Sequence, residues 1–209
     1  EMVRRSPQQQ RIYVTNLLSN SVRLDQPPEN EITVIDDARA NVVERIILDN
    51  ANVGRWIAFP PDGSLAVVAI NRPKNLVPMV QVARGWVVTN GFAVMAPGSG
   101  QAPVQLLVDL PNQAYADAYG TVFTPDGRKF YLSCAGSDAV MAIDVGAVRR
   151  VMEDVWQGRL SRPADDLGLS RRYVVARIAV GANPQALAMS VDGRWLYVAN
   201  RLDDSISVI

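Results

Sequence analysis

Histidine is absent from the 209 residues, and cysteine occurs only once, as Cys134. Without histidine, these residues cannot form a Ser-His-Asp triad, a His-ligated zinc site or a His-ligated haem site. A lone cysteine also permits no disulfide within the chain. Cys134 lies in the strand-like run FYLSCAG, where a buried, inert thiol is favoured over a reactive one. We therefore expect no catalytic residue, no metal site and no cofactor held by these residues.

The chain also has no excess of positive or negative charge, because 21 Lys and Arg residues balance 21 Asp and Glu residues. With a formal net charge of zero, the chain lacks the excess of positive charge that nucleic-acid-binding proteins carry. The sequence also has no apolar run long enough to span a membrane. Apolar residues nevertheless make up 48% of the chain, which indicates a folded domain with a sizeable core.

The chain does contain an internal repeat of a turn followed by a strand. PDG or VDG turns mark three copies, and a degenerate PQQ at residues 7–9 marks the first. Four residues after each turn, the same position of the next strand holds Tyr13, Val67, Tyr131 or Tyr197. Asp-Gly supplies the positive φ that a tight hairpin needs. The spacing predicts hairpins at the turn pairs Asp62-Gly63, Asp126-Gly127 and Asp192-Gly193.

Further strands complete each unit, such as ITVID (32–36), VMAID (140–144) and NVVERIIL (41–48). The second strand ends at Asn16 and Asn200 in two copies, and Asn tolerates left-handed backbone. The Asp that closes VID can accept backbone N–H groups in the following turn. Such a meander cannot bury both of its faces alone, so its copies must stack radially. The sequence therefore predicts an all-β propeller of four-stranded antiparallel blades.

These motifs resemble the YVTN-repeat family of β-propellers, as seen in RIYVTN, NEITVID, PDGRKFYLSCAGSDAVMAID and VGANPQALAMSVDGRWLYVANRLDDSISVI. The second copy departs from the pattern, because LAVVAIN keeps only the Asn of the signature. The family is typically seven-bladed and exported by bacteria or archaea. The resemblance implies a periplasmic or extracellular protein of which about four blades are present. The remaining blades, or another chain, would complete the ring, and a closed four-bladed ring is the alternative.

The repeat divides the chain into blades of about 1–50, 51–110, 111–180 and 181–209, the last lacking its outer strand. Blade 2 carries a long insertion at 72–103, and blade 3 a helical insertion at 146–172. In the second insertion apolar residues recur at helical spacing, ended by Gly158: Val148, Val151, Met152, Val155 and Trp156. This face is expected to dock on its own domain, with a partner interface as the alternative.

Basic and aromatic residues gather in the first insertion, at Arg72, Lys74, Arg84 and Trp86. One hypothesis is a recognition loop for an anionic ligand or partner. The alternative is a hairpin whose tryptophan packs on the blade and whose charges are solvated. Asp165-Asp166 is interpreted as part of a solvated loop, because no regular oxygen-ligand spacing for Ca²⁺ surrounds it.

Propellers host many functions, so the function must be argued from sites. The residues favour a non-catalytic binding or scaffold propeller. The insertions resemble those of YVTN propellers that work beside c-type cytochrome domains, which implies a docking platform for such a redox partner. Two alternatives stay open. One is a propeller enzyme, lactonase-like or haem-dependent, whose catalytic residues lie outside these 209; the other is a surface-layer repeat protein.

Overall fold

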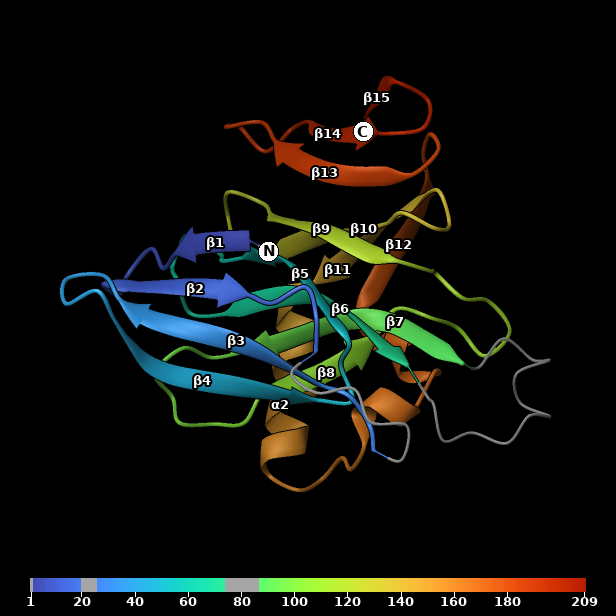
Figure 1. Ribbon diagram of the computed structural model, residues 1–209. Helices are drawn as coiled ribbons and strands as arrows, with labels where there is room; N and C mark the ends of the chain where they lie inside the picture. Colours follow the sequence, from blue (N-terminus) through green and yellow to red (C-terminus); the bar gives the residue numbers. More distant parts are fainter. Residues whose placement is uncertain (1, 20–25, 74–86) are drawn as a thin grey trace.

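The computed structural model describes residues 2–19, 26–73 and 87–209, which form four antiparallel sheets in series (Figure 1). Three of these sheets have four strands, and the last has three. Within every sheet the strands pair in chain order. The structure therefore confirms the predicted all-β fold of repeated four-stranded meanders.

The strand bounds follow the repeat from sheet to sheet. Sheet 1 consists of β1 (Met2–Arg5), β2 (Arg11–Thr15), β3 (Glu29–Asp36) and β4 (Asn41–Asp49). Sheet 2 consists of β5 (Val53–Ala58), β6 (Ala66–Pro73), β7 (Val88–Met95) and β8 (Val104–Leu107). Sheet 3 consists of β9 (Ala118–Phe123), β10 (Lys129–Cys134), β11 (Ala139–Asp144) and β12 (Val174–Ala179). Sheet 4 consists of β13 (Pro184–Met189), β14 (Leu196–Asn200) and β15 (Ser205–Val208).

The predicted Asp-Gly turns adopt the geometry that the sequence demands. Gly63, Gly127 and Gly193 have φ values of +60°, +67° and +70°. In each turn the preceding Asp accepts a hydrogen bond from the backbone N–H of the residue after the glycine, at 3.0–3.1 Å. The first copy lacks Asp-Gly, and there the Ser6 hydroxyl accepts from the Gln9 N–H at 3.3 Å. A side-chain oxygen thus fixes all four hairpins.

The residues that end the strands match expectation only in part. Asp36 accepts from the backbone N–H groups of Ala38 and Arg39, as predicted for the Asp of VID. Neither Asn16 nor Asn200 adopts left-handed backbone, however. The Asn200 side chain instead donates to the hydroxyls of Ser205 and Ser207, at 3.1 and 2.9 Å. The asparagine of the repeat therefore ties β14 to β15 rather than relaxing a turn.

The sheets fan around a shared side, on which the first strands β1, β5, β9 and β13 neighbour one another in order. Each pair of adjacent sheets encloses its own apolar cluster. Successive residues of β6 pack in different clusters: Val67 packs toward sheet 3, and Val68 packs toward sheet 1. A Cβ on Gly120 would stand 2.2 Å from the Gln185 carbonyl oxygen, so glycine permits the close approach of β9 and β13.

The helical insertion lies between β11 and β12. Asp144 is the N-cap of helix α2 (Val145–Trp156), and its carboxylate accepts a hydrogen bond from the Ala147 N–H at 2.6 Å. Its apolar face is buried in the same cluster as sheets 2 and 3, which confirms docking on its own domain. Two short helical turns follow, η1 (Pro163–Asp165) and η2 (Leu169–Arg172). In the described part of the chain no helix combines the length and apolar character needed to cross a membrane.

Candidate binding cleft

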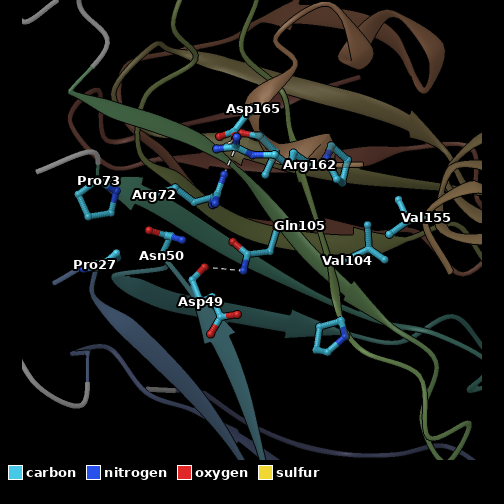
Figure 2. Close-up of a pocket in the computed structure, with 13 residues that line it drawn as sticks. Pro27, Asp49, Asn50, Arg72, Pro73, Val104, Gln105, Val155, Arg162 and Asp165 are labelled. Carbon is cyan, nitrogen blue, oxygen red and sulfur yellow. Dashed lines mark hydrogen bonds and ion pairs between the residues drawn. The ribbon is translucent and has the colours of Figure 1, made fainter. Parts of the chain in front are cut away.

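A cleft of about 810 Å³ opens where the ends of β4, β6 and β8 meet the helical insertion (Figure 2). Four prolines stand in its wall, which are Pro27, Pro73, Pro103 and Pro163. Proline fixes its own φ and has no N–H, so these positions give the wall a rigid shape. Figure 2 shows Arg72, Arg162 and Asp165 grouped on one side, with Gln105 and Asp49 on the other.

Arg72 lies near the end of β6 and points into this cleft. Its Nη1 donates to the carbonyl oxygen of Ala164 in η1 at 2.8 Å. Its Nε is buried and has no hydrogen-bond partner. Burial lowers the pKa of Arg72, and the nearby carboxylates of Asp165 and Asp49 partly oppose that shift. Arginine stays protonated at neutral pH even so, and Arg72 is therefore a half-buried cation.

The second cation of the cleft has different surroundings. Arg162 forms an ion pair with Asp165 at 2.9 Å, and its side chain is 83% exposed. Because water surrounds both groups, this pair contributes little to stability. Across the cleft, Gln105 Nε2 donates to the Asp49 carbonyl oxygen at 2.7 Å, while Gln105 Oε1 is buried without a partner. The cleft thus offers one unsatisfied donor and one unsatisfied acceptor.

This arrangement suits recognition. A guanidinium with free N–H groups can hold a carboxylate, and a side-chain amide can pair with a peptide group. Of the described residues that line the cleft, none is a serine, cysteine or histidine that could form a nucleophile–base pair. Among the residues that the structure describes, no three His, Cys, Asp or Glu side chains gather closely enough to hold a metal ion.

The structure accounts for the sequence-predicted site residues unevenly. Arg72 lines the cleft. Lys74, Arg84 and Trp86 fall outside the described residues, so their grouping with Arg72 stays a prediction. Asp165 lies on the rim of the cleft beside Arg162, and the Asp166 carboxylate accepts from the Gly168 N–H at 2.8 Å.

Sequence reasoning did not connect Arg162, Gln105 or Asp49 to Arg72. They belong to three different sheets or insertions, and no local pattern links them. A sequence signal does exist in the four prolines, because Pro73 ends β6, Pro27 and Pro103 come shortly before β3 and β8, and Pro163 begins η1. That signal marks loops in general and does not indicate which loops meet.

A second polar surface lies along the first strands of the sheets, toward the shared axis. The Arg4 guanidinium lies over the Trp56 ring, 5.6 Å from its centroid, and Arg55 lies 4.4 Å from the centroid of the Tyr119 ring. Arg55 also forms an ion pair with Asp117 at 2.9 Å. Each of these contacts joins adjacent sheets, and cation–π pairs of this kind add modestly to the packing between them.

Cys134 is fully buried in the core between sheets 2 and 3. Burial raises the pKa of its thiol, which therefore stays protonated and unreactive at neutral pH. The interpretation of Cys134 as a small core residue is confirmed.

Comparison with known proteins finds similarity to hydrazine synthase. No protein-family model matches it. Hydrazine synthase subunit beta of Kuenenia stuttgartiensis is 32% identical over 179 residues, which are 85% of this chain and 46% of that protein. A solved structure of Kuenenia stuttgartiensis hydrazine synthase matches 100% of this chain and 57% of its own, with a TM-score of 0.91 and 28% identity. The chain thus spans about half the length of these relatives.

More distant structures share the architecture. The periplasmic gluconolactonase PpgL of Pseudomonas aeruginosa matches 99% of this chain and 52% of its own, with a TM-score of 0.61 and 17% identity. At that identity the likeness shows the fold alone. The comparisons therefore support a propeller-like fold and similarity to a chain that is one subunit of a larger enzyme.

Proposed function

We propose that this chain belongs to a non-catalytic propeller subunit that binds partner chains within a redox enzyme complex of the hydrazine synthase kind. The observation that carries the proposal is the match of all 209 residues to hydrazine synthase at a TM-score of 0.91. The 32% identity to the subunit designated beta points to the same complex. A c-type cytochrome domain is the partner class implied by the resemblance of the repeats to YVTN propellers.

We also propose that further blades, on the same polypeptide or another chain, complete a YVTN-type ring beside these four. Exposed apolar side chains lie on the first and last sheets, including Val3, Ile47, Ile206 and Val208. Open apolar faces and unpaired strand edges favour association. Under this proposal the four sheets correspond to blades of about 1–50, 51–110, 111–180 and 181–209.

Export to the periplasm is part of the same proposal. The YVTN resemblance supports it, since that family is typically exported. The fold shared with a periplasmic gluconolactonase agrees with it. A lactonase-like activity has only that distant fold likeness in its favour, and the described residues that line the cleft include no serine, cysteine or histidine for it. We therefore favour the binding subunit over the enzyme.

Co-purification of the full-length protein with the other chains of its complex tests this function. We expect a tagged full-length protein, expressed together with those chains, to retain them through gel filtration at a fixed stoichiometry measured by native mass spectrometry. The same protein purified alone should not hydrolyse gluconolactone. A monodisperse protein that binds none of the chains and hydrolyses the lactone would contradict the proposal.

A further inference from the structure

We propose that the cleft around Arg72 is the docking site for a peptide segment of a partner chain, in which a single Asp or Glu carboxylate pairs with the Arg72 guanidinium. The inference rests on the proposed function, because it specifies how a partner chain is held. It concerns described residues only, and it locates the contact at the outer rim of sheet 2, away from the axis on which the sheets converge.

The hydrogen bonding of Arg72 is the first observation behind this inference. A guanidinium carries five N–H donors, and the bond to Ala164 engages only Nη1. The edge formed by Nε and Nη2 has no hydrogen-bond partner among the described residues. A carboxylate can bind this edge in a bidentate manner, with each carboxylate oxygen accepting one N–H. Leaving such a donor buried and unpaired is costly, so an incoming acceptor would relieve that cost.

The charge around Arg72 is the second observation. No carboxylate of the described residues forms an ion pair with it, although Asp49 and Asp165 line the same cleft. The two aspartates would repel a multiply charged anion such as phosphate. A single carboxylate that approaches between them meets the cation at lower cost. The charge balance of the cleft therefore favours an Asp or Glu side chain.

The size and amide chemistry of the cleft favour a peptide over a free carboxylate. A cleft of about 810 Å³ is far larger than a small carboxylate requires. The buried, unpaired Oε1 of Gln105 can accept a hydrogen bond from a main-chain N–H. A peptide segment supplies both groups at once, an acid for Arg72 and an amide for Gln105. The rigid proline wall leaves little reorganisation for binding to require.

Arg162 provides a matched control within the same cleft. It carries the same charge on the same rim, but its side chain is mostly exposed and already paired with Asp165. A surface charge of this kind affects binding weakly, whereas a desolvated charge that loses its partner affects it strongly. The two arginines thus separate docking at Arg72 from general attraction of the rim for acidic proteins.

The first experiment compares Arg72→Gln and Arg162→Gln in the full-length protein. The dissociation constant for its partner chains is measured by biolayer interferometry, and thermal unfolding confirms that each variant is folded. We expect Arg72→Gln to weaken binding about tenfold or more, and Arg162→Gln to change it by about twofold or less. Equal affinity of wild type and Arg72→Gln would overturn the proposal.

A second experiment stays informative even if Arg72→Gln fails to fold. Arg72→Lys keeps the positive charge and introduces an amine, which a water-soluble carbodiimide couples to a touching carboxylate as an amide. Within the 209 residues the other lysines are Lys74 and Lys129, and peptide sequencing distinguishes their cross-links from those of residue 72. We expect mass spectrometry to find residue 72 joined to an Asp or Glu of a partner chain.

The remaining outcomes separate this inference from the function on which it rests. Cross-links from residue 72 only to Asp49 or Asp165 of the same chain would overturn the docking site. A wild-type complex that forms while Arg72→Gln binds equally well refutes the cleft and leaves the proposed function standing. Failure of the wild-type protein to bind any partner chain refutes the proposed function, and the docking site with it.

Discussion

The same repeat builds the interface between sheets 2 and 3 and the outward face of sheet 4. The two surfaces nevertheless differ strongly in solvent exposure. Val67 and Phe92, in the interface, are fully buried. On sheet 4, Tyr197 is 41% exposed and Ile206 is 67% exposed. Val67 and Tyr197 occupy the same place in their repeats, and only Val67 has another sheet beyond it. The comparison teaches that the repeat encodes a surface for the next blade, while the neighbour decides whether that surface is buried.

The other side of the fan shows the same dependence. The residue one position further along the second strand faces the preceding sheet, and Val68, Leu132 and Val198 are all buried there. Val14 takes this place in sheet 1 and is only partly buried, since no described sheet precedes it. The two ends of the series are therefore each apolar on the side that would meet a further blade.

The largest effect is expected from Phe92→Ala, in the middle of the interface. The Phe92 ring makes edge contacts with Phe130 at 5.1 Å and Tyr173 at 5.9 Å. Its loss leaves a cavity between two sheets and should lower the free energy of unfolding by about 3–5 kcal/mol. Urea unfolding followed by tryptophan fluorescence measures it. A loss below about 1 kcal/mol would show that sheets 2 and 3 do not share one core.

A matched pair of tyrosines tests the comparison directly. Tyr13→Ala removes a buried ring that packs on Phe59 and should lower the free energy of unfolding of the 209-residue chain by about 3 kcal/mol. Tyr197→Ala, at the equivalent position of sheet 4, should change it by about 0.5 kcal/mol or less. In the full-length protein, a further blade should raise the cost of Tyr197→Ala toward that of Tyr13→Ala. Equal small costs for Tyr197→Ala in both proteins would refute ring completion on that side.

Tyr173→Phe should have an intermediate effect. The Tyr173 hydroxyl is buried and donates to the Leu107 carbonyl oxygen at 2.6 Å, which joins the helical insertion to β8. Burial raises the pKa of Tyr173, so the hydroxyl remains a donor throughout the neutral range. Its removal should cost about 1–3 kcal/mol in chemical unfolding. Tyr131→Phe, whose hydroxyl has no hydrogen-bond partner among the described residues, serves as the control.

The smallest effect concerns pH and the hairpin turns. The Ser190 hydroxyl and the Arg194 N–H donate to Asp192 and hold the pKa of that carboxyl below its usual value. A lowered pKa in the folded state contributes stability above the ordinary pKa of Asp, and this contribution disappears as pH falls through the lowered value. Asp192→Asn should therefore lower the melting temperature at pH 7, and lower it less near pH 2, about two units below the ordinary value.

The control for this last comparison is Asp204→Asn, an exposed position with left-handed backbone that Asn also adopts. It should leave the melting temperature unchanged at both pH values. A difference for Asp192→Asn that is equally large at the low pH would show that the turn depends on side-chain shape rather than charge.

Much of the fold could be predicted because the residues that specify each turn and strand of the repeat lie close together in the sequence. Asp126 and Gly127 define a turn within four residues, and the alternation of Val67 and Val68 defines two faces of one strand. The sequence does not predict the hydrogen-bond partners of the asparagine at the strand end. Asn200 bonds to serines of the next strand, and such a contact depends on strand pairing that the residues before it do not reveal.

The candidate cleft could be predicted only at Arg72. Its position after an apolar strand, in a segment rich in basic residues, predicts a binding residue there. Its neighbour Ala164 lies 92 positions later, and Gln105 comes from another strand of the same sheet. Chain positions this far apart meet only through the packing of the insertion on sheet 2.

The sequence by itself determined the repeating hairpins, the two apolar faces of each sheet and the absence of histidine chemistry. These properties reside in short stretches of chain, where backbone φ, side-chain alternation and composition act without distant partners. Tertiary structure alone decided that Arg72 is half-buried, that Tyr197 faces water and that four prolines line one cleft. Each of these depends on which segment lies next to which, and that is fixed only when the sheets pack together.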